Sequence, residues 1–328
     1  MDNQKKSRIA TINTAARFSK DIRRCLFLSL LLVLVSAALT VFRPTILSYL
    51  DNRFFDIMLQ SLPMEQVHPT PVVVSIDDKS LRKFGQWPWS RSLLARLLRE
   101  TLGLGASTIG LDLILSEPER MPTGRGLDNA MAKDRSISVK ENAEPESGDR
   151  ALARLLIDAS ITLGYKFLFA ETQTGDIEKL PHPLKNAVLH ASPSYPIDAL
   201  QAVDALCNIP EFSRAATGSG FVNAGADTDG VLRRVPLFIQ YKGDLFPNLA
   251  LASLMMHTDR SDVLVESNQD GMTFCWNGRK IPLDENGNYL LRYKGRKNTF
   301  PHYSAADILD GSIPSVALKD KLVFIGAT

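Results

Sequence analysis

The chain has 328 residues, of which 45% are hydrophobic and 23% are charged, and its formal net charge at pH 7 is +2. These values are typical of a chain that folds around a packed core, so fibrous and wholly disordered classes are excluded. Residues 1–24 carry seven basic and two acidic side chains, which leaves a net charge of −3 for the rest. A general nucleic-acid binder needs a basic surface, so we expect no nucleic-acid partner.

Residues 25–42 contain no charged side chain and lie between two basic residues, Arg24 and Arg43. Eighteen helical residues, at about 1.5 Å each, are close to the minimum that crosses a hydrocarbon layer of about 30 Å. Basic flanks stay on the cytoplasmic side. We therefore predict a cytoplasmic leader (1–24), a transmembrane helix (25–42) and an extracytoplasmic domain (43–328). A signal peptide cleaved after the small residues 36–38 is the alternative.

The next segments alternate between helical and extended patterns. Residues 45–62 keep a helical apolar spacing and predict a stalk helix. Apolar strands are expected at 71–77, 107–115, 161–170 and 321–328, with leucine-rich helices at 90–105 and 149–159 among them. Strands that are apolar on both faces and separated by helices indicate an α/β fold, in which a mostly parallel sheet is covered by helices on both faces.

Other segments depart from this pattern. Residues 116–148 are charged and poor in large apolar residues, which predicts a long polar surface insertion. A helix is expected near 197–206, and residues 220–224 and 231–241 are expected to form neighbouring strands joined by a tight turn. Asn-Gly pairs at 277–278 and 286–287 predict an added region of antiparallel hairpins.

The last strand, 321–328, ends without the helix or turn that would cover it. We therefore expect the C-terminus of the domain to be truncated.

Motifs for common chemistry are missing. The five histidines stand alone, and the acidic turns at 227–230 and 284–288 lack the spacing of a calcium loop, so they are read as tight turns. No phosphate-binding loop or nucleophile elbow is found. We predict no catalytic residue, no metal and no cofactor. Cys207 and Cys275 form either a disulfide or two separate thiols.

Acidic and aromatic residues gather after the first two predicted strands, whose carboxyl ends are where open α/β sheets bind ligands. The candidate ligand-binding residues are Asp77, Asp78, Trp87, Trp89, Arg91, Asp112 and Glu117. Two indoles, several carboxylates and one guanidinium can hold a small polar ligand or an ion. In the structural alternative, Asp78 caps the next turn, Asp77 pairs with Arg91, and the tryptophans fill the sheet edge.

At these residues the sequence resembles the CHASE domain of type 2, a family of extracytoplasmic sensory domains associated with bacterial cyclases and histidine kinases. The matching pieces are 50–59, 73–81, 85–98, 106–119, 220–238, 246–252, 299–309 and 321–328. The Gln-Trp-Pro-Trp piece and the Asp-Gly-Val-Leu-Arg-Arg-Val-Pro piece are the most specific.

The resemblance implies a sensory domain in a bacterial inner membrane, with a single span in this chain, its N-terminus in the cytoplasm and its main domain in the periplasm. It also implies further membrane helices and a cytoplasmic output enzyme, such as a cyclase, a diguanylate cyclase or a kinase. That output lies outside this chain, so the chain itself is expected to have no enzyme activity. The family supplies no established ligand residues.

The expected function is a membrane-anchored input module of a transmembrane signalling protein. The expected partners are the lipid bilayer, through residues 25–42, an unknown small molecule or envelope protein as the signal, and a second copy of the chain in a homodimer. One alternative is an anchored scaffold or protein-interaction module. Another is an anchored metal-dependent enzyme that uses Asp77 and Asp112.

Overall fold

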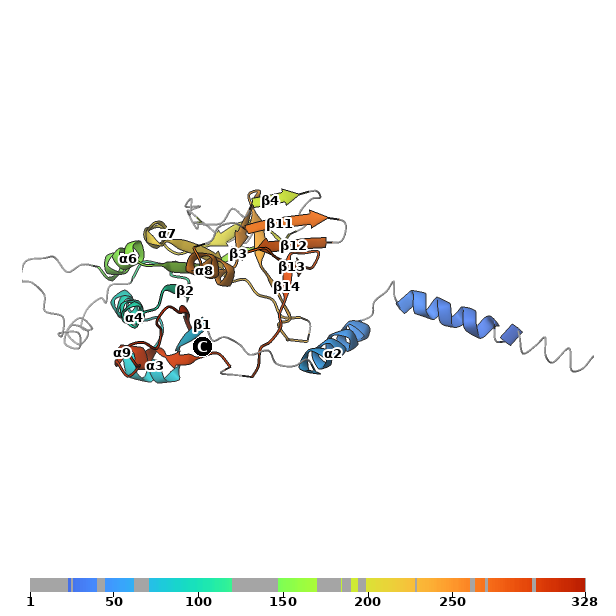
Figure 1. Cartoon of the computed structure of the whole chain (residues 1–328), viewed down its shortest axis with the longest axis horizontal. Coiled ribbons are helices and arrows are strands. Elements are labelled where there is room, and N and C mark those ends of the chain that lie inside the picture. Colours follow the sequence, from blue (N-terminus) through green and yellow to red (C-terminus); the bar gives the residue numbers. More distant parts are fainter. Residues whose placement is uncertain are drawn as a thin grey trace, which may run out of the picture. The chain divides into compact units, whose positions relative to one another are not determined.

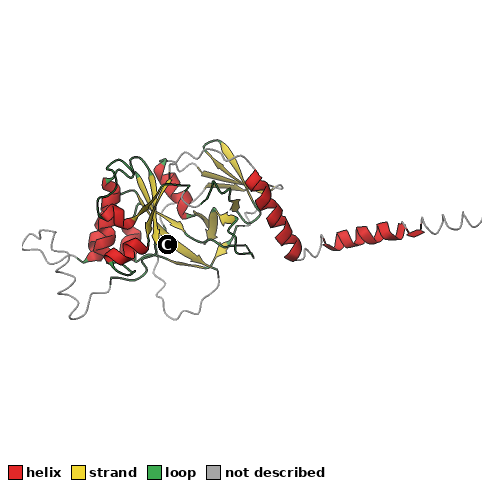
Figure 2. Ribbon diagram, turned by 90° about the horizontal axis from the view of Figure 1, so that it is seen from below, coloured by secondary structure: helices red, strands yellow, loops and turns green. Residues whose placement is uncertain are grey.

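The computed structural model divides the chain into two compact units, Met1–Met64 and Glu65–Thr328, and each is described by itself. Figure 1 shows the elements along the chain, and Figure 2 shows the helices in red and the strands in yellow. The described residues are 23–24, 26–39, 45–61, 71–119, 147–169, 184, 190–193, 199–227, 229–259, 263–268, 271–296 and 299–327.

The described part of the first unit is helical. Residues 26–39 form a helix that exposes large apolar side chains such as Phe27, which is 66% exposed. The predicted span 25–42 includes residues 25 and 40–42, which lie outside the described residues. In the part of the chain that the structure describes, no helix is both long enough and apolar enough to span a membrane. The helix predicted at 45–62 is confirmed as α2 (Thr45–Ser61).

A mostly parallel sheet forms the centre of the second unit, as the apolar strands predict. Its order is β15-β1-β16-β2-β3-β6, and β7 also pairs with β3. Every described pairing in this sheet is parallel except that of β6 with β3. The strands are β1 (Pro71–Ile76), β2 (Thr108–Asp112), β3 (Ile161–Leu168), β6 (Asp204–Leu206), β7 (Gly218–Phe221), β15 (His302–Ser304) and β16 (Leu322–Ala327).

The last strand of the sequence lies inside the sheet. In β16, Val323 pairs with Val72 of β1 on one side and with Ile109 of β2 on the other. Strand β16 therefore completes the ladder between two strands that are neighbours in sequence. A parallel strand buried on both faces needs a continuous apolar run, and residues 322–325 (LVFI) supply it.

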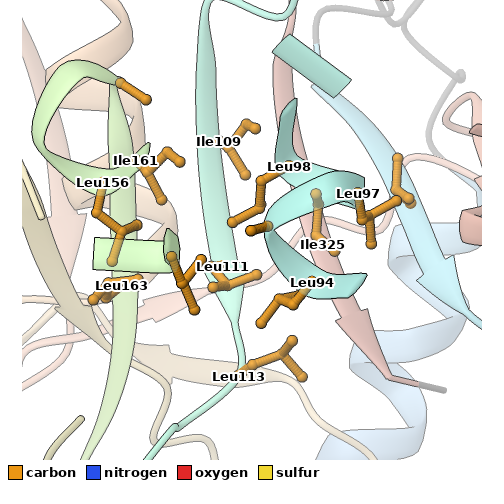
Figure 3. Packing of buried hydrophobic residues seen from close by; sticks show 14 of the residues in the cluster. Leu94, Leu97, Leu98, Ile109, Leu111, Leu113, Leu156, Ile161, Leu163 and Ile325 are labelled. Atoms are coloured by element: carbon orange, nitrogen blue, oxygen red, sulfur yellow. The ribbon is translucent and has the colours of Figure 1, made fainter. Parts of the chain in front are cut away.

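One face of the sheet is covered by five helices that share the main apolar core: α3 (Asp78–Phe84), α4 (Arg91–Gly103), α6 (Gly148–Asp158), α7 (Pro210–Ala215) and α9 (Ala305–Leu309). Helix α4 is capped by Ser90, whose hydroxyl accepts a hydrogen bond from Leu93 N at 3.2 Å. Figure 3 shows Leu94 and Leu98 packed against Leu111 and Ile325 of the sheet. Each fully buried leucine contributes about 2 kcal/mol of transfer free energy.

The opposite face carries α8 (Leu249–His257), which packs closely because two strands present glycine to it. A Cβ added at Gly110 would lie 2.7 Å from Ser253 Oγ, and one added at Gly220 would lie 2.6 Å from Leu249 Cα. Neighbouring residues of a strand point to opposite faces. Because Leu111 contacts the α4 side and Gly110 the α8 side, the prediction of helices on both faces is confirmed.

The predicted region of antiparallel hairpins is confirmed in part. Strand β12 pairs antiparallel with β11 and with β13, but β4 and β5 pair in parallel with β11 and β9, and β14 pairs with β8 rather than with β13. The largest sheet of this region has the order β13-β12-β11-β4, and its tightest turn is at 277–278, where both residues have positive φ. Smaller ladders join β14 to β8, β10 to β9, and β9 to β5. The strands are β4 (His190–Pro193), β5 (Gln201–Ala202), β8 (Arg234–Pro236), β9 (Phe238–Tyr241), β10 (Asp244–Pro247), β11 (Val263–Asn268), β12 (Gly271–Trp276), β13 (Arg279–Leu283) and β14 (Asn288–Leu290).

Two local predictions are wrong. Residues 197–206 were expected to be helical, but β5 and β6 lie there, and Val203 N between them donates to Leu168 O of β3 at 2.9 Å. The segments at 220–224 and 231–241 are not neighbouring strands, since β7 pairs with β3 whereas β8 pairs with β14. Long-range pairing outweighs local pattern in both places.

Three further expectations concern the insertion, the turns and the thiols. Of the predicted insertion at 116–148, residues 120–146 lie outside the described residues, and Ser147 caps α6. The turns at 227–230 and 284–288 are confirmed by Gly230 N–Asp227 O and Gly287 N–Asp284 O hydrogen bonds. Both Cys207 and Cys275 are free thiols, so the disulfide alternative is excluded in this structure.

Candidate functional site

The structure places the seven predicted site residues in three locations. Asp77 and Asp78 lie at the start of α3, and Asp112 ends β2. The other four, Trp87, Trp89, Arg91 and Glu117, line one pocket of about 590 Å³. The expectation that they meet where strands β1 and β2 end thus holds for four residues of the seven.

Asp77 is a helix cap. Its Oδ1 accepts hydrogen bonds from Ser80 N at 3.0 Å, Ser80 Oγ at 2.7 Å and Ser304 Oγ at 2.8 Å. Burial alone raises the pKa of this carboxyl, but the hydrogen bonds from Ser80 and Ser304 outweigh burial and bring the pKa below its usual value. Asp78 is the exposed first residue of α3. The structural alternative is right about capping, but the cap is Asp77 rather than Asp78.

The segment between α3 and α4 positions the two tryptophans differently. Trp89 is 5% exposed, and its Nε1 donates to Gly85 O at 2.9 Å. Its ring packs edge-on against Phe84, with 6.0 Å between centroids. Trp87 is half-buried, precedes a cis peptide bond to Pro88, and lies 6.4 Å from the Trp89 ring. Trp89 therefore fills the core, and Trp87 offers the more accessible indole surface.

Arg91 is buried beneath the pocket and joins three segments. Its Nε donates to Asp149 Oδ1 at 3.2 Å, and its Nη2 donates to Glu117 O at 2.7 Å. Its guanidinium also lies 5.8 Å from the centroid of the Phe212 ring. It does not pair with Asp77 as the structural alternative expected, because the α3 cap uses Asp77. We call Arg91, Asp149 and Glu119, together with the Glu117 carbonyl, the Arg91 clamp.

Glu119 closes the Arg91 clamp. Its Oε1 accepts from Arg91 N at 2.9 Å, and its own N–H donates to Asp149 Oδ2 at 2.9 Å. A carboxylate at the first turn of α4 is stabilised by the free N–H groups and the dipole of that helix. The Arg91 clamp thus fixes the segment that follows β2 against the starts of α4 and α6.

The pocket lies above the Arg91 clamp and combines indole, aliphatic, hydroxyl and carboxylate groups. Its lining residues are Trp87, Pro88, Trp89, Ser90, Arg91, Ile114, Leu115, Ser116, Glu117, Pro118 and Glu119. Its volume falls in the range of sites for small organic molecules, about 300–1,000 Å³. The backbone of Leu115 is held from behind by Asn208, whose Oδ1 accepts from Leu115 N at 2.8 Å.

Asp112 does not line this pocket. It ends β2 beside Gly326, where a Cβ added to the glycine would lie 3.7 Å from Asp112 Oδ2. The Asp112 side chain is exposed, although the surrounding strand ends remove enough water to raise the pKa of its carboxyl. Within the described ranges, no group of three His, Cys, Asp or Glu side chains could hold a metal ion.

Sequence reasoning missed the partners that complete the site. Asp149 and Glu119 are 58 and 28 residues from Arg91, and residues outside the described ranges separate them in the chain. The available signal was the helical pattern that begins at 149, because an acidic residue at a helix start is a common cap or dipole partner.

A second charged cluster, also missed, surrounds Arg233, which is 3% exposed. Its guanidinium donates to Asp227 Oδ2 at 2.9 Å and makes two bonds to the Asp229 carboxylate at 2.9 and 2.8 Å. The hydrogen bonds from Arg233 outweigh desolvation and lower the pKa of Asp229 to about 2. This cluster closes the turn between β7 and β8.

Comparison with known proteins adds one result. The protein-family model described as the CHASE2 domain matches residues 29–328, which include the Trp87–Arg91 pocket and the Arg233 cluster. No curated protein and no solved structure matches the chain. Because the match covers nearly the entire chain, this protein belongs to the CHASE2 domain family.

Proposed function

We propose that this chain is the membrane-anchored, extracytoplasmic input module of a bacterial transmembrane signalling protein, and that its pocket at Trp87 receives the signal. CHASE2 is a family of sensory domains rather than of catalysts. The observation that carries the proposal is the pocket of about 590 Å³ lined by Trp87, Arg91 and Glu117. It lies where β2 ends, which is the usual ligand position in open α/β sheets.

The groups that line the pocket favour a small organic ligand. The half-exposed Trp87 indole offers an apolar face, while the Ser90 and Ser116 hydroxyls and the Glu117 carboxylate offer polar contacts. Sites of this kind bind the apolar part by burial and fix orientation through a few polar groups. An envelope protein that inserts one side chain would use the same contacts.

The Arg91 clamp provides a means of response. A ligand can shift an equilibrium only by binding one conformation more tightly than another. A ligand that contacts Glu117 or Pro118 also acts on the segment after β2, which Arg91 holds against α4 and α6. A ligand that binds more tightly when the hydrogen bonds of the Arg91 clamp are formed would therefore stabilise all three segments together.

Membrane anchoring through residues 25–42 is part of the proposal. The described helical residues 26–39 expose leucine, valine and phenylalanine on all sides, as a helix in lipid does. Basic residues at 23 and 24 favour an N-terminus in the cytoplasm. Coupling to further membrane helices and to a cytoplasmic output enzyme completes the proposed signalling protein. A second copy of the chain is its proposed partner in a homodimer.

The anchored-enzyme alternative gains no support from the site. Its first carboxylate, Asp77, already accepts three hydrogen bonds as a helix cap. A carboxylate committed in this way is a poor general base, because its hydrogen bonds stabilise the charged form.

Isothermal titration calorimetry of the full chain in detergent micelles tests the pocket through the heat of binding. The probes are glucose, tryptamine and indole-3-acetate, which represent a neutral sugar, an amine and an acid. We expect a saturable heat of binding with one of these classes, lost in Trp87→Phe and kept in Trp276→Phe. A heat of binding that survives in Trp87→Phe but disappears in Trp276→Phe would place ligand binding elsewhere.

Co-flotation tests the anchor. We expect the full chain to float with phospholipid vesicles after a wash at high salt, and a chain with Leu31→Lys and Val35→Lys to remain in the dense fraction. A wild-type chain that is released by salt would contradict insertion.

A further inference from the structure

The hydroxyl of Tyr165 is buried on β3. Tyr165 is 1% exposed, and its ring packs edge-on against Phe167 with 5.1 Å between centroids. Among the described residues, its Oη has no hydrogen-bond partner. A buried phenol without a partner destabilises a fold, and such groups in proteins are commonly satisfied by a bound molecule.

A small cavity of about 10 Å³ lies beside Tyr165. Its polar lining includes Cys207, Asn208, Ser213 and Ser219. A space of about 10–15 Å³, on this measure, holds one water molecule, provided that two or more polar groups face it. The size therefore excludes an organic ligand and admits a single molecule as large as water.

The neighbouring groups determine what the cavity accepts. The Asn208 amide is engaged twice, because Oδ1 accepts from Leu115 N at 2.8 Å and Nδ2 donates to Gly164 O at 2.8 Å. Ser213 Oγ donates to Asn208 O at 3.1 Å, so its own lone pairs can accept a further hydrogen bond. Tyr165 supplies an O–H donor and an acceptor.

The thiol and the phenol that line this cavity are neutral. Burial, and then the nearby Asp204 carboxylate, raises the pKa of the Cys207 thiol to about 12. The pKa of the Tyr165 phenol is raised as well, mainly by burial and to a smaller extent by the nearby Cys207 thiol. Both groups stay neutral at physiological pH, and their surroundings oppose an anion.

We propose that this cavity binds one neutral molecule of the size of water, which hydrogen-bonds to the hydroxyls of Tyr165 and Ser213 and so joins β3 to α7. The site is independent of the proposed signal ligand. It adjoins the pocket through Asn208, which borders the cavity and holds Leu115 of the pocket wall. Strand β3, helix α7 and the pocket wall therefore meet at one polar centre in an apolar core.

Thermal unfolding of the full chain in detergent tests the proposal, because the Tm of one variant should change in opposite directions with and without a bound molecule. If a molecule is bound to the hydroxyl, Tyr165→Phe loses that hydrogen bond and lowers the Tm. If the hydroxyl is unpaired, the same substitution removes a buried polar group at no loss and raises the Tm. A Tm that rises or does not change would overturn the proposal. Tyr241→Phe, in the same aromatic cluster but half-buried, is the matched control and should leave the Tm unchanged.

A high-resolution crystal structure of the wild-type full chain gives a second test that needs no variant to fold. We expect one density peak within hydrogen-bond distance of both Tyr165 Oη and Ser213 Oγ. A dry cavity, or a peak bound to neither hydroxyl, would overturn the proposal.

Discussion

Two buried arginines organise two loops of this protein in different ways. Arg233 is 3% exposed and binds two carboxylates that lie only four and six residues before it, Asp229 and Asp227. Arg91 is 8% exposed and binds Asp149, 58 residues away, and the carbonyl of Glu117, 26 residues away. The first arginine closes a turn, and the second joins three segments beneath a pocket.

The two arginines use similar hydrogen bonds to oxygen atoms for different purposes. A local cluster can only fix the conformation of its own turn, because all its members lie within one short segment. The Arg91 clamp depends on segments that meet only in the folded domain, so its strength reports on their arrangement. A ligand that moves any of these segments changes the clamp, which suits a sensory domain.

The largest expected effect comes from breaking the local cluster. Arg233→Met leaves the Asp227 and Asp229 carboxylates without their main partner, so we expect it to lower the unfolding free energy more than any of the changes below. Urea unfolding followed by circular dichroism measures it. Arg234→Met is the control, because Arg234 is 46% exposed and its contacts to Asp227 and Asp284 are 3.9 and 3.8 Å. We expect a loss below about 1 kcal/mol there. Equal losses would refute the role of Arg233.

Breaking the Arg91 clamp should cost slightly less, about 2–4 kcal/mol for Arg91→Met, because part of its bonding is to a backbone carbonyl. A double-mutant cycle with Asp149→Asn should give a coupling energy of about 1–3 kcal/mol. The same cycle with Asp229→Asn should be additive within about 0.5 kcal/mol, since Asp229 belongs to the other cluster. Additivity of Arg91 with Asp149 would show that the two side chains do not form a clamp.

A smaller effect is expected at the α3 cap. Asp77→Ala removes the acceptor for Ser80 N and should lower the unfolding free energy by about 1 kcal/mol. Asp78→Ala, at an exposed neighbouring position, should change it by less than about 0.5 kcal/mol. The same urea titration measures both. A larger loss at Asp78 would restore the capping role that the structural alternative gave to Asp78.

The smallest expected effect concerns pH. The pKa of Asp229 falls from 3.8 to about 2 in the fold, chiefly because Arg233 donates to it against the opposing cost of desolvation. A lowered folded pKa contributes stability above about pH 4, and that contribution is lost as pH falls toward about 2. Asp229→Asn should therefore flatten the acid side of the stability profile between these values. If the acid side of the stability profile did not change, Arg233 would not stabilise the charged form of Asp229.

Much of the fold could be predicted from the sequence, because buried parallel strands and amphipathic helices have distinct patterns. The strands at 71–77 and 107–115 and the helix at 149–159 are confirmed close to their predicted bounds. The place of β16 between β1 and β2 could not be predicted, since no local pattern encodes which strands pair. Residues 197–206 mix apolar and polar residues at spacings that fit either period, and pairing with β3 and β9 decided in favour of strands.

The site was predicted in part for the same reason. Trp87, Trp89 and Arg91 follow β1 and Glu117 follows β2, and because these two strands are parallel, their carboxyl ends lie at the same edge of the sheet. Asp77 also follows the end of β1, but its side chain caps helix α3 and does not line the pocket. Asp149 had no such signal, because its contact with Arg91 depends on how α6 packs beside α4.

The central claim, an extracytoplasmic sensory domain with an accessible pocket, is tested most directly by labelling the pocket rim in intact spheroplasts. Ser116→Cys places a thiol at an exposed lining position, in a background with Cys25→Ser and Cys275→Ser in which Cys207, the remaining native cysteine, stays buried. We predict that a membrane-impermeant maleimide modifies position 116 before lysis. Modification only after lysis would place the domain on the cytoplasmic side and contradict the account.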